Sequence, residues 1–203
     1  SGAADPHRRF GGSRALFVRG TAVFEPSSAF NARLKLNYMR DRQTGGSAFQ
    51  TTSCPDGLEN YTGIPFFSPT EDCRVDRRLA LVYMDPEAFG GLRNGGVPFT
   101  HVTQKFGTFE WNYQLSSDIV LTSVTGYYDL LTDAMMNAAV AQYAGPTMIA
   151  DKHFRREELT QELRLSTDWV GPVNITAGGF LQDGEISNDI VIAANTLYGL
   201  PPR

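Results

Sequence analysis

The stretch that decides the fold runs from Glu158 to Gln182 and reads ELTQELRLSTDWVGPVNITAGGFLQ. Before the turn at 168–172, Leu159, Leu163 and Leu165 share one parity, and charged or polar residues take the other. After the turn, Val173, Ile175, Ala177, Gly179 and Leu181 share a face. Successive side chains of a β-strand point to opposite sides of the sheet, so a period of two indicates strands. The stretch therefore predicts a hairpin with one apolar face and one polar face.

The same alternation recurs in both directions along the chain. Between Phe30 and Asp41, apolar residues alternate with Asn31, Arg33, Lys35 and Asn37, which a helix would scatter around its circumference. Near 119–130 the even-numbered residues from Val120 to Leu130 are assigned to the apolar side, although Ile119 and Leu121 blur the start. The polar side is assigned Ser123, Thr125, Tyr127 and Asp129. Together these runs predict about six long strands, near 15–24, 30–41, 103–115, 119–130, 158–167 and 173–182.

The connections between these runs alternate between short turns and long loops. The two long loops are predicted at 42–102 and 131–157, so all the short turns fall at one end of the sheet. Runs of ~10 residues approach the length that a tilted strand needs to cross hydrocarbon. Short turns, long loops and strict alternation are typical of a membrane barrel. We expect an all-β fold. Residues 1–203 would form an antiparallel up-and-down meander that is one segment of a transmembrane β-barrel.

Aromatic and charged residues extend this prediction. Six aromatic residues lie on the apolar parity or beside turns, where membrane barrels place interfacial girdles: Phe24, Tyr38, Trp111, Tyr113, Tyr128 and Trp169. Nine charged residues are expected to face the lumen: Arg19, Arg33, Lys35, Asp41, Glu110, Asp129, Glu158, Glu162 and Arg164. Their mixed signs favour a wet lumen or a plug surface over a pore selective for one sign of ion.

Composition narrows the functional classes. The 203 residues carry a formal net charge of −4, which argues against nucleic acid as a partner. Cys54 and Cys73 lie in one Gly- and Pro-rich stretch, and no residue set completes a zinc site. We expect a disulfide between them, which implies an oxidising compartment; two unrelated thiols are the alternative. His7, His101 and His153 are assigned to solvated terminus and loops. We expect no catalytic residues, no metal and no cofactor, and therefore not an enzyme.

Three motifs resemble the barrel of TonB-dependent outer-membrane receptors. QELRL at 161–165, followed by a Gly-Pro turn and AGGF at 177–180, is similar to a hairpin of that family. RGT at 19–21 with FEP at 24–26, and TSVTGYY at 122–128, are looser matches. The resemblance implies a bacterial outer-membrane receptor, surrounded by lipid, that takes up a scarce nutrient such as a ferric siderophore or a glycan. The family couples uptake to an inner-membrane energy complex through a plug domain inside the barrel. The sequence shows no match to a plug, so coupling is expected only through a plug that these 203 residues do not contain. Six strands are too few to close, and we expect a segment of a larger barrel or a truncated product.

Two further expectations follow. Aromatic residues of the long loops, Tyr61, Phe66, Phe67 and Tyr143, are candidate ligand contacts. The alternative interpretation is a soluble, secreted antiparallel β domain that binds a ligand and is stapled by one disulfide. The two interpretations differ in whether six apolar residues are exposed on one sheet or buried between two sheets: Leu34, Leu36, Leu163, Leu165, Val173 and Ile175.

Overall fold

A computed structural model describes residues 12–45, 83–84, 86–87, 90–137 and 148–194. The chain forms one six-stranded antiparallel sheet in which every strand pairs with its neighbours in sequence, the order being β1-β2-β3-β4-β5-β6. The strands are β1 (Gly12–Ser27), β2 (Phe30–Thr44), β3 (Phe99–Ser116), β4 (Ile119–Asn137), β5 (Met148–Thr167) and β6 (Thr176–Ala194). A short 3-10 helix, η2 (Arg93–Gly96), precedes β3. The predicted all-β meander is thus confirmed.

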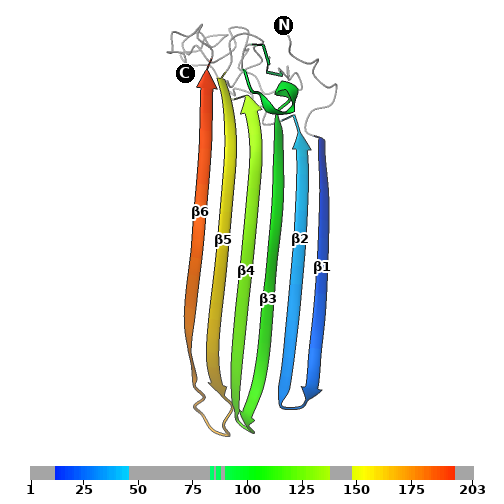
Figure 1. The fold of residues 1–203 in the computed structure, drawn as a ribbon. Helices are drawn as coiled ribbons and strands as arrows, with labels where there is room; N and C mark the ends of the chain where they lie inside the picture. Colours follow the sequence, from blue (N-terminus) through cyan, green and yellow to red (C-terminus); the bar gives the residue numbers. More distant parts are fainter. Residues whose placement is uncertain (1–11, 46–82, 85, 88–89, 138–147, 195–203) are drawn as a thin grey trace, which may run out of the picture.

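The two ends of the sheet differ (Figure 1). The connections β1–β2, β3–β4 and β5–β6 are short and lie together at the lower end of the view, and the longer connections leave from the other end. In the described part of the chain, the outer edges of β1 and β6 have no strand partner. No helix among the described residues is long and apolar enough to cross a membrane.

The strands extend farther toward the long connections than the sequence predicted. Strand β5 begins at Met148 and β6 continues to Ala194, so the predicted loop 131–157 and the predicted strand end at Gln182 are both wrong. Strand β3 likewise starts at Phe99 rather than near 103. The β5 extension, from Asp151 to Glu157, carries charged residues on both faces, and the β6 extension carries its carboxylates on the face that is apolar nearer the turn. The predicted alternation ends there, although the backbone ladder does not need it.

A small core packs only at the long-connection end. Met84, Phe99 and Met135 are buried against one another, with Leu92 and Ile149 beside them. The Met84 N–H donates to the Gly96 carbonyl oxygen at 3.0 Å, which holds Met84 against the end of η2. Elsewhere the described residues form a single layer with no second sheet covering it.

Some predicted residues lie outside the described ranges. These are Cys54 and Cys73, with their proposed disulfide, the loop candidates Tyr61, Phe66, Phe67 and Tyr143, and His7.

Candidate membrane-facing surface

The register places one set of side chains on a common side of the sheet, here called the belt face. It comprises the even-numbered residues of β1 and β2 and the odd-numbered residues of β3 to β6, since paired residues point to the same side. Toward the short turns this face is mainly apolar. Its members there include Val18, Ala22, Phe24, Leu34, Leu36, Phe109, Trp111, Tyr113, Leu121, Tyr127, Leu159, Leu163, Leu165, Ala177 and Leu181.

The apolar part of the belt face is exposed. Leu34 and Leu36 on β2 are 38% and 56% exposed, and Leu163 and Leu165 on β5 are 47% and 38% exposed. Val173 and Ile175, in the β5–β6 turn, are 64% and 50% exposed. A contiguous apolar surface across six strands is far larger than a soluble monomer usually leaves in water. All six residues that separate the two interpretations are therefore exposed, the four leucines on a single sheet and Val173 and Ile175 in a turn, because β6 starts at Thr176 rather than at the predicted 173.

The apolar part has a sharp edge toward the long connections. On each strand we take the first charged side chain of the belt face, counted from the short turns. These are Arg14 on β1, Arg40 on β2, Lys105 on β3, Asp129 on β4, Glu157 on β5 and Asp183 on β6.

This edge is oblique to the hydrogen-bonded rows of the sheet. Lys105, Asp129 and Glu157 share one row, which continues to Glu185 on β6, two residues beyond Asp183. On the other side, Lys105 pairs with Tyr38, two residues short of Arg40. Arg40 in turn pairs with Leu16, again two residues short of Arg14 on β1. The edge therefore shifts by three steps of two residues between β6 and β1.

If the apolar edge lay parallel to a membrane surface, the shift would correspond to a strand tilt. Six residues at about 3.4 Å, over five inter-strand steps at about 4.8 Å, give an angle of about 40°. Strands of transmembrane barrels tilt by ~35–45° from the membrane normal. On β1 and β2 the apolar part runs from Leu16 to Phe24 and from Phe30 to Tyr38. Such a run of about nine residues measures about 27 Å along the strand and about 21 Å along the normal at this tilt, close to the ~25 Å band of known barrels.

Polar residues within the apolar part satisfy one another. Gln161 donates to the Ser123 hydroxyl at 2.9 Å, and Thr125 donates to the Gln161 carbonyl oxygen at 2.6 Å. The Gln161 amide also donates to the backbone oxygen of Glu162 at 2.9 Å. Ser123 is 5% exposed. Polar groups inside an apolar surface need partners within the protein, and this cluster provides them.

Aromatic rings gather near the short turns. Phe24 meets Phe30 edge-on, and Phe30 stacks on Trp111, each pair at 6.4 Å between ring centroids. Tyr113 lies opposite Phe30 on β3. Tyr128, however, lies on the opposite face, where its hydroxyl accepts a hydrogen bond from Gln104 at 3.1 Å. Its inclusion among the girdle residues was wrong.

The other side of the sheet, here called the polar face, carries eight of the nine residues predicted to face a lumen: Arg19, Arg33, Lys35, Asp41, Glu110, Glu158, Glu162 and Arg164. Arg164 contacts Glu162 at 3.1 Å, and Arg156 contacts Glu158. Asp129 instead lies on the belt face, 3.4 Å from Lys105. The alternation of β4 was assigned to the wrong sides because both of its faces carry apolar and polar residues. Its orientation is set by the pairing with β3, which includes a bulge at Gln114/Ser116.

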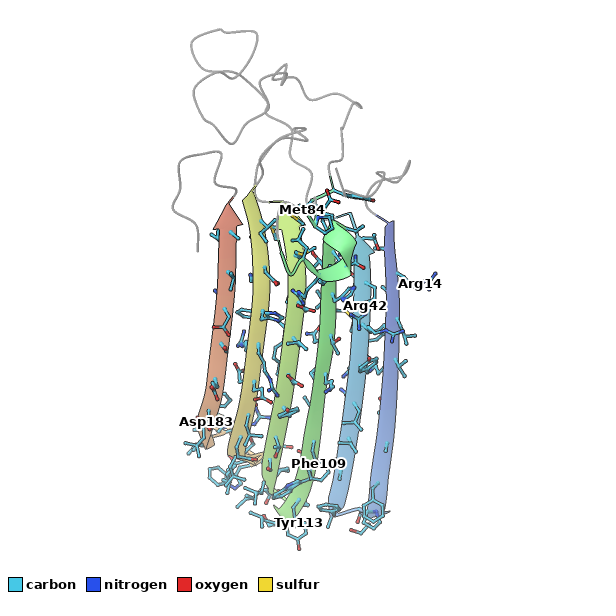
Figure 2. All side chains as sticks on the ribbon, turned by 45° about the horizontal axis from the view of Figure 1, so that its top comes forward. Arg14, Arg42, Met84, Phe109, Tyr113 and Asp183 are labelled. Atoms are coloured by element: carbon cyan, nitrogen blue, oxygen red, sulfur yellow. The ribbon has the colours of Figure 1, made fainter. Side chains whose placement is uncertain are left out.

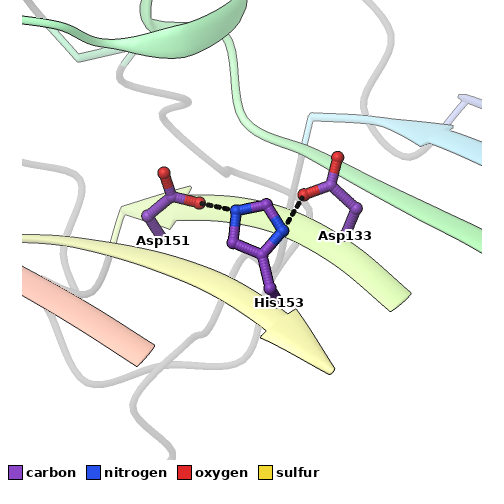
Figure 3. Close-up of side chains that lie close together, drawn as sticks. All are labelled: Asp133, Asp151 and His153. Atoms are coloured by element: carbon purple, nitrogen blue, oxygen red, sulfur yellow. Dashed lines mark ion pairs between the residues drawn. The ribbon is translucent and has the colours of Figure 1, made fainter. Parts of the chain in front are cut away.

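A charged cluster on the belt face lies at the long-connection end (Figure 3). His153 stands between two carboxylates, with Nδ1 3.2 Å from Asp133 and Nε2 3.9 Å from Asp151. Arg93 of η2 binds both carboxylates, at 2.7 Å to Asp133 and 3.1 Å from its Nε to Asp151. Burial acts to lower the pKa of Arg93, but the hydrogen bonds to Asp133 and Asp151 raise it above its ordinary value. The cluster ties the segment before β3 to β4 and β5.

Asp133, Asp151 and His153 also offer three ligand atoms within 4.8 Å of one another, a spacing that suits a metal ion. Arg93 already occupies both carboxylates, so an ion would have to displace a guanidinium. The cluster is best explained as an ionic anchor. His101 and His153 lie in strands β3 and β5 rather than in loops, which corrects their assignment. The sequence hid the cluster because Asp133, Asp151 and His153 fell in a predicted loop.

Comparison with known proteins adds no assignment: no family model, no curated protein and no solved structure matches the chain.

Proposed function

We propose that these six strands form part of the wall of a transmembrane β-barrel, with the belt face toward lipid and the polar face toward the lumen. The observation that carries the proposal is the oblique edge of the apolar surface. Nothing in a soluble sheet requires its apolar boundary to cross the hydrogen-bonded rows at about 40°. Tilted strands in a flat membrane do require such a boundary, because the membrane surface cuts each strand at a different residue.

The proposal imposes a requirement on the two outer edges. Strands β1 and β6 would each leave a long row of backbone N–H and C=O groups in hydrocarbon, which costs several kcal/mol per unsatisfied group. Further strands must pair with both edges in the membrane. The proposed barrel is therefore larger than six strands.

Within this class we propose a TonB-dependent outer-membrane receptor that imports a scarce nutrient such as a ferric siderophore or a glycan. The support is the QELRL, AGGF and RGT motifs, which lie on β5, β6 and β1. Mixed charges on the polar face are compatible with a wet lumen or a plug surface. Energy coupling would come through a plug and an inner-membrane complex, and the long connections would hold the ligand contacts.

Lipid contact can be tested with the intrinsic fluorescence of Trp111. The chain has two tryptophans, so Trp169→Phe leaves Trp111, on the belt face of β3, as the single reporter. The protein is reconstituted in phosphatidylcholine vesicles brominated at different acyl positions. Because Trp111 lies in the half of the apolar part nearest the short turns, we expect strong quenching by acyl-chain bromines, greatest at the positions nearer the headgroups. Absence of quenching at every bromine position would overturn the proposal.

The receptor assignment has a separate test. Uptake of a panel of labelled ferric siderophores and glycans is measured in source cells with and without the gene, and with a protonophore. We expect one substrate class to lose uptake in both the deletion strain and the de-energised cells. Unchanged uptake of the whole panel on deletion would overturn the receptor assignment but leave the barrel proposal standing.

A further inference from the structure

Charges on the belt face separate into two halves beyond the apolar edge. Strands β1 to β3 carry four cations there, Arg14, Arg40, Arg42 and Lys105, and no described carboxylate on that face. Strands β4 to β6 carry a mainly acidic set, Asp129, Asp133, Asp151, Glu157, Asp183, Glu185 and Asp189, with Arg155 among them. The four cations are here called the cationic band.

The cationic band is exposed and has few partners among the described residues. Arg14, Arg40 and Arg42 are exposed, and none of them forms an ion pair with another described residue. Lys105 reaches Asp129 at 3.4 Å while its side chain stays 56% exposed. Figure 2 places Arg14 and Arg42 toward the end of the sheet opposite Phe109 and Tyr113. Clustered arginines without neighbouring carboxylates fit an anionic partner, and the guanidinium group matches the geometry of phosphate as well as carboxylate oxygens.

An apolar groove of about 230 Å³ opens directly below Lys105. Its floor is Gly107, flanked by Leu36 on β2 and Tyr127 on β4, with Leu34 and Phe109 farther down. A Cβ atom at Gly107 would come within 2.9 Å of the Leu36 side chain, so a larger residue here would displace Leu36 or narrow the notch. The groove runs from the cationic band into the apolar part of the belt face.

We propose that the cationic band and this groove form a binding site for a phosphate-bearing membrane lipid. The phosphate contacts Lys105 and Arg40, with Arg14 farther along the apolar edge and Arg42 beyond it, and one acyl chain lies in the groove at Gly107. An amphiphile is the occupant that matches both parts, because a soluble anion would leave the groove unfilled and a neutral lipid would leave the cations unpaired. The inference rests on the proposed function, since the belt face must meet lipid.

The test uses the Trp169→Phe protein, in which Trp111 lies two residues beyond Phe109 on the same face. Vesicles of phosphatidylcholine contain a minor fraction of either brominated phosphatidylglycerol or brominated phosphatidylcholine. The ratio of quenching by the two lipids measures preference for the anionic headgroup. Juxtamembrane cations each attract anionic lipid by roughly 1 kcal/mol, a factor of about five. We expect a clear preference, about fivefold or more, in the parent protein.

Two matched variants locate the preference. Arg40→Gln/Arg42→Gln/Lys105→Gln removes three charges from the cationic band and should bring the ratio to about one. Arg19→Gln/Arg33→Gln/Lys35→Gln removes the same charge from the polar face of β1 and β2 and should keep the parent ratio. In both variants, quenching by brominated phosphatidylcholine alone should persist, which shows that the protein is still inserted.

The outcomes separate this inference from the proposed function. Equal ratios in the parent and in the cationic-band variant, with Trp111 still quenched by phosphatidylcholine, would overturn the lipid site and leave the barrel proposal intact. Protection of Trp111 from both lipids would mean that protein, such as a second copy, covers the belt face, and both proposals would fail.

Discussion

Gly96 is the residue that most tightly constrains the segment before β3. Its φ is +83°, and a Cβ atom there would lie 1.9 Å from the carbonyl oxygen of Met84. We expect Gly96→Ala to detach this segment from Met135 and Phe99 at a cost of about 1–3 kcal/mol, from strained backbone and the displaced contact. Faster amide exchange at Met84, whose N–H donates to the Gly96 oxygen, is the measurement.

Gly95 provides the control for this prediction. It also has a positive φ, +62°, but a Cβ atom added to it would meet nothing within 4 Å. Gly95→Ala should therefore show only the smaller cost of the backbone conformation. Equal exchange rates at Met84 in the two variants would show that the contact with Met84 contributes nothing.

For single residues, the sequence reveals the residue type but not which distant residues it contacts in the fold. Arg33, Lys35 and Glu162 could be assigned to one face because each sits in a clean alternating run. The anchor formed by Arg93, Asp133 and Asp151 could not be predicted, since its members are far apart in the chain and meet only through the register of β4 and β5. The contact between Gly96 and Met84 is hidden for the same reason.

Strand β4 shows what the pairing of elements adds to the sequence. Val124 is one of the even-numbered residues of β4, which the sequence assigned to the apolar side. It lies instead on the polar face, between Glu110 of β3 and Glu162 of β5. Leu34 of β2 lies on the belt face between Ala22 and Phe109. The two apolar residues look alike in sequence and differ in the surroundings that their strands give them.

This difference gives a paired prediction. In the membrane-inserted protein, Leu34→Arg should lower the free energy of unfolding by about 2–4 kcal/mol, because an arginine would face hydrocarbon near the middle of the apolar run. Val124→Arg should change it little, because two carboxylates flank the new guanidinium. Urea unfolding in vesicles measures both. A larger cost for Val124→Arg than for Leu34→Arg would mean that β4 is turned the other way.

The elements whose alternation is clean were predicted well from the sequence. Strand β2 was predicted to within a few residues because its faces differ along nearly its whole length. The outer half of β5 was missed because both of its faces carry charged residues. The outer half of β6 was missed because its pattern is reversed: its carboxylates lie on the belt face, and Ile186, Ile190 and Ile192 lie on the polar face. In the proposed membrane orientation these halves lie beyond the apolar edge, where a strand keeps its hydrogen bonds without an apolar belt face.

For the whole molecule, the central feature is the oblique apolar edge. Each strand's sequence contains its own apolar run, but the slant appears only when the six runs are aligned by their pairing. Val18 on β1 and Glu185 on β6 belong to one continuous hydrogen-bonded row, and the edge passes between them. If the strands tilt by about 40°, five inter-strand steps of about 4.8 Å separate the two positions by about 15 Å in depth.

The most direct measurement is therefore the depth of nitroxide labels at these two positions. Each label is placed on a single cysteine in a Cys54→Ser/Cys73→Ser protein reconstituted in vesicles, and its collision rates with oxygen and with a water-soluble nickel chelate are compared. We predict that a label at Val18 collides mainly with oxygen, as in hydrocarbon, and that a label at Glu185 collides mainly with the chelate. Equal accessibility at the two positions would place the row parallel to the membrane surface, or outside a membrane altogether, and would contradict the proposed membrane orientation.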